Sequence, residues 1–340
     1  MTTPRHGTRR RAFSSPPVRQ RGIAMLVAIL LVALGTIIAA AVAYDSAMTA
    51  RRGAATLSFD DALLVSQGAE ALAAYGLRSV MQMSKTGTSG TIDVYATQPW
   101  AEPVGPLEVV PGVTLEAQME DMQGRFNLNW LVADTGTNLG KPDPAMVEAF
   151  KYLLQLATVD PKWADMVVDW IDRDNQPQTQ GAEDSAYLGQ NPPYLAANQY
   201  ITSITELLAL PGFGHDNYQK LEPYISALPP DTTLNICTAK DKVLDAFNVG
   251  AVNWSSDPTA LQKNRSTAPG CFPTVQEYQA SFSDQTKYTA SQARFKTTSK
   301  YFRLSSLVTI GTAEFNLYSL LYLDSNGYFI HPIQRIFSPD

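Results

Sequence analysis

The pattern of apolar and polar residues begins with an apolar stretch, residues 23–43, in which Thr36 is the single polar side chain. As a helix at about 1.5 Å per residue, this stretch would span about 31 Å, which is the thickness of a bilayer's hydrocarbon core. From residue 45 to about residue 85 there is no proline, and apolar residues recur at helical spacing. The pattern predicts one long helix, with a transmembrane half over residues 23–43 and an amphipathic half over residues 44–85.

Beyond this helix, strand-like segments lie on both sides of a helical block. Strands are predicted at residues 107–110, 113–122, 301–310, 314–322 and 328–336. Helices are predicted at residues 146–156, 162–171, 203–208, 217–225 and 240–247, with a short strand at residues 232–237. The polar segment 253–298 shows one helix, near residues 274–281. Pro332 predicts an edge position or a break in the last strand.

This order favours one sheet that is interrupted by an inserted α-helical domain. Two separate β units are the alternative, but each would have too few strands to be stable alone. The amphipathic half of the long helix needs a surface to cover its apolar side, and the following sheet is the obvious candidate.

Residues 1–22 contain six arginines and no acidic residue. Positive flanks stay cytoplasmic, so the chain after residue 43 is predicted to lie on the other side of the membrane. A cleaved secretory signal would have an apolar region of about 7–15 residues, which is shorter than this one. Two interpretations remain open at this point: a plain membrane anchor, and a leader of the type IV pilin kind that is cut after Gly22.

Removal of residues 1–22 leaves 20 basic against 32 acidic residues. Such an acidic body argues against a nucleic-acid partner, because phosphate binding requires a basic surface. Hydrophobic content of 45% with charged content of 17% is typical of a folded chain.

An acidic cluster follows the predicted helix at residues 162–171. Its members are Asp169, Asp172, Asp174, Glu183 and Asp184. Carboxylates on a loop between helices are ligands that suit calcium. The spacing does not match an EF-hand, because Gln176 and Pro177 stand where that loop needs a ligand and a glycine. A solvated acidic loop is the alternative interpretation.

The two cysteines, Cys237 and Cys271, lie in the part predicted to be outside the cytoplasm. There they are expected to form a disulfide, with two unrelated buried thiols as the alternative. The histidines, His6, His215 and His331, belong to no recognisable catalytic motif. We therefore expect a protein that is not an enzyme.

Several segments together carry a resemblance to a known family. They are residues 21–26, residues 121–129 (Asp-Met-Gln-Gly-Arg-Phe-Asn-Leu-Asn), residues 169–172, residues 181–184 with Tyr187 and Tyr194, residues 204–207 and residues 233–239. In this order, and over nearly the whole length, the chain resembles the minor pseudopilin K family of type II secretion systems, also called general secretion pathway protein K.

The resemblance implies an α+β fold: a pilin-like long N-terminal α-helix packed on an antiparallel sheet, with a large α-helical domain inserted between strands. Residues 1–22 would be a cleaved cytoplasmic leader, residues 86–126 and 299–340 the pilin-like sheet, and residues 127–298 the inserted domain. Prepilin peptidase would cut between Gly22 and Ile23, and Ile23 would be N-methylated.

The family also suggests roles for individual residues. K proteins are associated with calcium in the acidic inserted region, which implies structural calcium at Asp169, Asp172, Asp174, Glu183 and Asp184. Most pilin-like proteins carry a glutamate at the fifth position after the cut, and that position is Val27 here. Because an unpaired charge in lipid is costly, a subunit without this glutamate suits the filament tip.

The implied function is a non-enzymatic minor pseudopilin at the tip of the type II secretion pseudopilus. It would form a complex with the minor pseudopilins I and J, and with H, to initiate assembly for the export of folded proteins. The implied location is the bacterial inner membrane, single-pass, with most of the chain periplasmic before it enters the pseudopilus. The alternative is a single-span, inner-membrane anchored periplasmic binding or sensor protein, whose leader is never cut.

Overall fold

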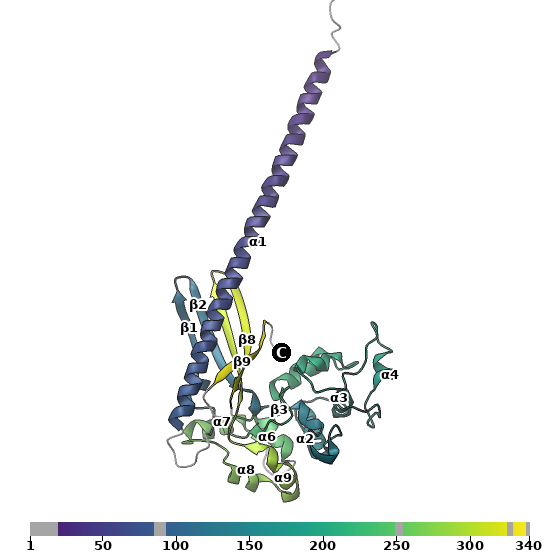
Figure 1. Ribbon diagram of the computed structural model, residues 1–340, viewed down its shortest axis with the longest axis vertical. Helices are drawn as coiled ribbons and strands as arrows, with labels where there is room; N and C mark the ends of the chain where they lie inside the picture. Colours follow the sequence, from purple (N-terminus) through teal and green to yellow (C-terminus); the bar gives the residue numbers. More distant parts are fainter. Residues whose placement is uncertain (1–19, 85–92, 249–253, 325–328, 338–340) are drawn as a thin grey trace, which may run out of the picture. The chain divides into compact units, whose positions relative to one another are not determined.

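The computed structural model describes residues 20–84, 93–248, 254–324 and 329–337, and the chain divides into two units, residues 1–60 and 61–340 (Figure 1). Helix α1 extends from Gln20 to Ser84, which agrees with the predicted end of the long helix. In the first unit, the apolar side chains of α1 are exposed. Among the described residues, α1 is the helix that is long and apolar enough to cross a membrane.

The second unit contains a five-stranded sheet in which every neighbouring pair is antiparallel (Figure 1). The strand order is β1 (Val104–Val110), β2 (Val113–Asp121), β7 (Tyr301–Ile310), β8 (Ala313–Leu323) and β9 (Ile330–Ile336). Strands from before and after the helical block therefore form one sheet, and the alternative of two separate β units is wrong.

One face of this sheet packs on the part of α1 that belongs to the second unit. Alternate residues of β7 are buried, as expected for a strand with one covered face. Phe302 and Leu304 share an apolar core with Leu77 of α1, and Val308 shares one with Ala62. The predicted packing of the amphipathic half of the helix on the sheet is confirmed.

Strand β9 lies at one edge of the sheet, so the edge position predicted from Pro332 is confirmed. An edge strand tolerates proline because its outer side needs no backbone donor. Arg335 of β9 forms a 2.7 Å ion pair with Glu70, which is buried on α1, and Ser319 donates a hydrogen bond to the same carboxylate. This polar contact fixes the long helix to the last two strands.

The region between β2 and β7 is mainly helical. Its α-helices are α2 (Pro144–Leu156), α3 (Trp163–Ile171), α4 (Asp184–Tyr187), α5 (Gly214–Leu221), α6 (Asp241–Phe247), α7 (Pro258–Thr267), α8 (Val275–Ser281) and α9 (Gln285–Ser291). Short parallel pairs join β3 (Phe126–Asn127) to β4 (Ile225–Ser226) and β5 (Leu234–Asn235) to β6 (Phe295–Lys296).

The 3₁₀ helices are short turns at element ends. They are Pro99–Ala101, Met122–Gly124, Leu128–Leu131, Gly136–Asn138, Ile204–Ala209, Glu222–Tyr224, Trp254–Ser256 and Gln292–Arg294.

An aromatic cluster around Phe126 lies in the core of this inserted region. The ring of Phe126 stacks on Phe150 at 5.4 Å and on Phe247 at 5.6 Å, and Trp130 meets it edge-on at 5.4 Å. Phe295, near the end of the insertion, contacts Phe247 at 5.2 Å. Residues near the start and near the end of the insertion therefore share one core, which holds its two ends together.

The sequence underestimates the helices of residues 253–298, where the structure has α7, α8 and α9 instead of one helix. Helix α7 buries one apolar residue, Leu261, so it shows almost no apolar periodicity. The helix predicted at residues 203–208 is the 3₁₀ helix Ile204–Ala209. The helix predicted at residues 217–225 is α5, which starts at Gly214 and ends before Pro223.

Candidate functional site

The acidic cluster of the inserted region lies between the end of α3 and the start of α4. The chain leaves α3 at Asp172, passes Asp174 and returns at Glu183, so that residues eleven positions apart in sequence face one another. One carboxylate oxygen from each of these three residues lies within 4.8 Å of the others. The geometry therefore brings three of the five predicted ligands together.

Two of these carboxylates have no internal partner. Both oxygens of Asp172 and both oxygens of Glu183 are buried and accept no hydrogen bond from any described residue. Burial, with the charges of Asp174, Asp169 and Glu183, raises the pKa of Asp172 to about 7. Burial, with the charges of Asp169, Asp174 and Asp184, raises the pKa of Glu183 to about 7. Without a counter-charge, ionisation of this cluster is costly.

A divalent cation would supply the missing counter-charge. Calcium takes oxygen ligands in flexible geometry, and four unpartnered carboxylate oxygens in one buried cluster fit that requirement. Asp172, Asp174 and Glu183 are the residues that would hold it. Tyr187, whose buried hydroxyl also lacks a partner among the described residues, lies between Trp170 and Tyr194 at ring distances of 5.2 and 5.5 Å.

The other two predicted ligands have backbone partners. Asp169 is fully buried, and both of its oxygens accept the Gln178 N–H at 3.1 Å. Burial raises the pKa of Asp169 to about 6. Asp184 accepts the Ala196 N–H at 3.0 Å. Asp165, which is not among the predicted ligands, accepts the Gln180 N–H at 3.2 Å. In the structure these three carboxylates shape the loop around the cluster.

A second polar constellation connects the sheet to the inserted region, and it is built from the family-like segment 121–129. Asp121, at the end of β2, is buried, and its carboxylate accepts hydrogen bonds from Asn235 at 2.9 Å and from Thr238 and Ser299 at 2.6 Å each. Its other oxygen accepts the Gln123 N–H at 2.9 Å. One carboxylate thus joins β2, the inserted region and the chain that returns to β7.

The asparagines of this segment continue the connection. Asn127 donates to the Leu228 carbonyl at 3.0 Å and to the Thr232 hydroxyl at 2.9 Å. Asn129 donates to the carbonyls of Ile201 and Leu228 at 2.8 Å each, and it accepts the Ile201 N–H. Both asparagines are almost fully buried, so these bonds satisfy backbone groups that water cannot reach.

Glu120 and Arg125 form the charged part of the same junction. Arg125 binds both oxygens of Glu120, at 3.1 and 2.8 Å, and donates to the Glu222 carbonyl at 2.8 Å. Lys240 and Arg303 also pair with Glu120, each at 3.1 Å. Burial alone would raise the pKa of Glu120, but the three cations hold it at about 2. The carboxylate stays ionised at any physiological pH.

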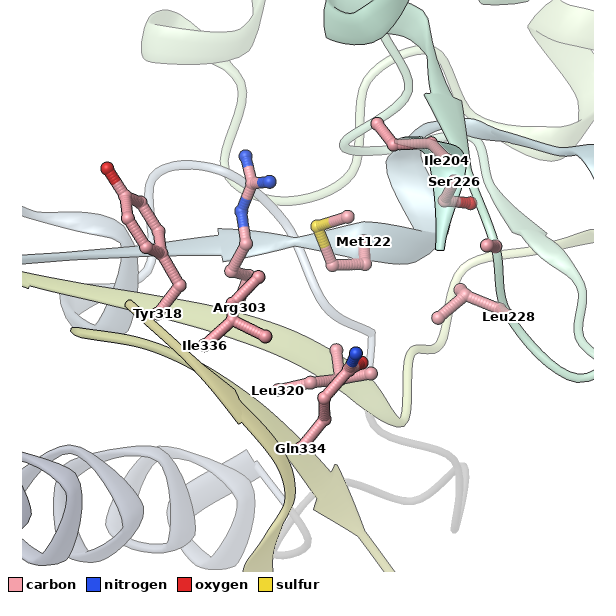
Figure 2. Close-up of a pocket in the computed structure, with 10 residues that line it drawn as sticks. Met122, Ile204, Ser226, Leu228, Arg303, Tyr318, Leu320, Gln334 and Ile336 are labelled. Carbon is pink, nitrogen blue, oxygen red and sulfur yellow. The ribbon is translucent and has the colours of Figure 1, made fainter. Parts of the chain in front are cut away.

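The inserted region meets the outer face of the sheet along a seam, and Figure 2 shows the side chains that line a pocket in it. It encloses a cavity of about 30 Å³, lined on one side by Met122 and Leu228 and on the other by Arg303, Leu320 and Gln334. That space holds about one or two water molecules. The seam therefore joins the inserted region to the sheet around a small cavity.

The remaining predicted residues are the two cysteines and three residues of α1. Cys237 and Cys271 form a disulfide with a Cα–Cα distance of 4.8 Å. Arg265 supports the same loop, because its guanidinium donates to the carbonyls of Phe272 and Ala239 at 3.0 and 2.8 Å. Gly22, Ile23 and Val27 belong to the first turns of α1.

A membrane-length helix packed on an antiparallel sheet defines a pilin-like protein, and the insertion between β2 and β7 distinguishes this chain from a plain pilin. A family profile described as type II secretion system (T2SS), protein K, matches residues 124–230, which include the junction asparagines and the acidic cluster.

Two relatives extend this match over most of the chain. The chain is 35% identical to the type II secretion system protein K of Pseudomonas aeruginosa, over 67% of this chain and 68% of that protein. It is 31% identical to the type II secretion system protein K of Pectobacterium carotovorum subsp. carotovorum, over 93% of this chain and 96% of that protein. The chain belongs to the type II secretion system protein K family.

A solved structure supports the same assignment. One chain in the crystal structure of the GspK-GspI-GspJ complex from the enterotoxigenic Escherichia coli Type 2 Secretion System matches with a TM-score of 0.70 and 25% identity, over 85% of this chain and all of that chain. The family and the fold expected from the resemblance are confirmed. The protein is a pseudopilin of a secretion system rather than an unrelated anchored sensor.

Proposed function

We propose that this chain is the minor pseudopilin at the tip of the type II secretion pseudopilus, where it joins the minor pseudopilins I and J to initiate assembly. The observation that carries the proposal is the match over the full length of one chain of the GspK-GspI-GspJ complex. Pseudopilin H is a further partner. The role is structural: the chain shapes the end of a filament and catalyses no reaction.

Val27 supports the tip position on physical grounds. A glutamate at the fifth position of the mature chain would need the N-terminal ammonium of another subunit, since neither charge is stable alone in lipid. Valine is uncharged and needs no such partner. A subunit that offers no ion pair to a subunit above it is suited to be the first in the filament.

The basic leader and the apolar helix support membrane insertion as the step before the chain is assembled into the pseudopilus. The chain enters the inner membrane as a single-pass protein with its body in the periplasm. Prepilin peptidase then removes residues 1–22, and Ile23 is N-methylated. The transmembrane half of α1 holds the subunit in the membrane until assembly extracts it into the pseudopilus.

Calcium is proposed as a structural cofactor at Asp172, Asp174 and Glu183. The unpartnered oxygens of the first and last of these support a cation at this place. When bound, the ion neutralises the cluster and joins the end of α3 to the start of α4. Asp169 and Asp184 hold the loop in the conformation that presents the cluster.

The partners can be tested with the full chain, tagged after Asp340 and co-expressed with the I and J proteins of the same secretion system. We expect both to co-purify with it from detergent-solubilised membranes, whereas recovery of the chain alone would refute the proposed complex. In pseudopili sheared from cells that overproduce the major pseudopilin, gold label against the tag should mark one end. Label along the whole length would exclude a tip position.

A further inference from the structure

A cleft of about 240 Å³ opens where the end of the sheet meets the inserted region, and none of its lining residues belongs to the acidic cluster. Its lining includes two tyrosines, Tyr301 and Tyr322, which we call the aromatic floor, and three polar residues, Asp231, Lys296 and Thr298, which we call the polar rim. We propose that this cleft binds one pyranose ring of a glycan strand. This role is additional to the tip function, and it would remain at any other position in the filament.

The aromatic floor provides the apolar part of such a site. Tyr301 of β7 and Tyr322 of β8 are register partners, and their rings lie 5.1 Å apart. His331 of β9, the register partner of Tyr322 on its other side, places a third ring 5.7 Å away. Tyr301 and Tyr322 are half-buried and line the cleft, with their ring planes inclined at 50°, whereas His331 is exposed beside them. Such rings combine an apolar face with a polar edge, which matches a sugar ring with its C–H face and its hydroxyl rim.

The polar rim provides hydrogen-bonding groups of both kinds. Within the described residues, the side chains of Tyr301, Tyr322, Thr298, Lys296 and Asp231 form no hydrogen bond to the protein, so these groups are available to a ligand. The lysine is a donor, the aspartate is an acceptor, and the threonine and tyrosine hydroxyls can both donate and accept. A sugar hydroxyl also donates and accepts, so this mixed set suits a polyhydroxy ligand better than a purely anionic one.

The back wall of the cleft is preorganised. Gln123 is buried, donates from its amide to the Thr233 carbonyl at 2.7 Å and accepts the Lys300 N–H at 2.6 Å. Gln123 therefore ties together two other lining residues of the cleft, Thr233 and Lys300. A ligand would meet a rigid surface and would lose little affinity to ordering of the protein.

The charge of the cleft favours a neutral ligand. The charged residues that line the cleft are of both signs, with Lys296 and Lys300 on one side of the balance and Asp231 on the other. Burial, Tyr322 and Asp231 together raise the pKa of Tyr301 to about 12, so its hydroxyl remains a donor at periplasmic pH. A phosphate site would gather several cations without a carboxylate among them. A periplasmic chain meets neutral pyranose rings in the cell wall and in outer-membrane polysaccharides.

The test uses the full chain in a zwitterionic detergent without a sugar head group. The probes are the N-acetylglucosamine tetramer, which has the chemistry of cell-wall glycan, and maltotetraose, a plain hexose polymer. Saturation-transfer NMR measures binding by the wild type and by the variants Tyr322→Ala, Thr298→Val and Lys296→Ala. Tyr318→Ala is the matched control, because Tyr318 lies on the same strand and faces the other cavity (Figure 2).

We expect the wild type and the Tyr318→Ala control to bind at least one probe with equal affinity. Tyr322→Ala should weaken binding about tenfold, which corresponds to about 1.4 kcal/mol and lies at the upper end of the range for an aromatic contact. Thr298→Val and Lys296→Ala, which leave the aromatic floor intact, should each weaken it measurably. Binding of the acetylated probe alone would assign the site to cell-wall glycan, and binding of maltotetraose alone to hexose polymers. No binding by the wild type, or equal binding by all variants, would overturn the proposal.

Discussion

Asn235 donates a 2.9 Å hydrogen bond from its side-chain amide to the carboxylate of Asp121, although 114 residues separate the two in the chain. Asp121 ends a strand of the pilin-like sheet, and Asn235 lies in the inserted region. The same amide also donates to the Val94 carbonyl and to the Ser299 hydroxyl. The insertion is therefore bonded into the sheet rather than tethered to it by two linkers.

Asp121→Asn tests the importance of this junction. The substituted amide would turn one acceptor into a donor facing Asn235, Thr238 and Ser299, and a buried polar group without its partner costs about 1–3 kcal/mol. We expect the free energy of unfolding in urea to fall by about that amount. Asp216→Asn, an exposed aspartate on α5, is the control and should change it by less than about 0.5 kcal/mol. Equal stability of the two variants would show that the junction is not important for folding.

The double variant Asp172→Asn, Glu183→Gln tests the calcium site. A cation that binds the folded state alone raises stability by about 2.7 kcal/mol at a concentration 100 times its Kd. Calcium should therefore raise the melting temperature of the wild type and have no effect on the variant. The exposed pair Asp216→Asn, Glu314→Gln is the control and should keep the full calcium response. If calcium still raised the melting temperature of the Asp172→Asn, Glu183→Gln variant, these two residues would not be the calcium ligands.

The same carboxylates predict an unusual pH dependence in the absence of calcium. The pKa of Asp172 and of Glu183 is about 7 in the folded state, above the ordinary values of 3.8 and 4.5. The folded protein then holds protons that the unfolded chain has lost, so the contribution of these groups to stability falls as the pH rises from about 4.5 to 7.

In chelator, the wild type should therefore lose stability relative to the double variant between pH 5 and 7.5. Calcium should abolish this loss, because the bound ion stabilises the ionised carboxylates. Urea unfolding at both pH values, with and without calcium, measures the difference. If the wild type in chelator instead becomes more stable relative to the double variant over this pH interval, the raised pKa values of Asp172 and Glu183 would be contradicted.

Gly181→Ala tests the loop that presents the cluster. A Cβ at this position would overlap the carboxylate of Asp169, which is fully buried and already bonded to Gln178. Forced contacts of this kind cost about 1–3 kcal/mol, and displacement of Asp169 would also disturb the loop. We expect lower stability together with a weaker calcium response in calorimetry. Gly189→Ala is the control, because its Cβ would meet its nearest neighbour at an ordinary 3.5 Å.

Much of the fold could be predicted from the sequence because its patterns are local. The alternation in β7 predicts both of its bounds, and the helical spacing of α1 predicts its end within a residue and its start within three. Helices α7 and α9 were missed because each buries very few side chains, so that their polar sequences resemble loops. The short parallel pairs of the insertion were unpredictable, since each joins segments far apart in the chain.

The candidate site shows the same division. The sequence shows that acidic residues gather in this loop, but it does not show their geometry. Which of the carboxylates lack partners depends on how the loop returns from Asp174 to Glu183. The segment 121–129 stood out through the family resemblance alone. Its asparagines bond backbone carbonyls such as that of Leu228, 101 residues from Asn127, and no side-chain pattern marks a carbonyl as a partner.

The central claim is that the chain is a processed pseudopilin, and the mass of the mature protein tests it most directly. Intact-mass spectrometry of the chain purified from inner membranes of cells with an active prepilin peptidase should show a protein that begins at Ile23 and carries one added methyl group. In cells without the peptidase, the leader should remain. A chain that keeps Met1 in both strains, or that begins at Tyr44, would contradict the account and support a plain anchor or a secretory signal.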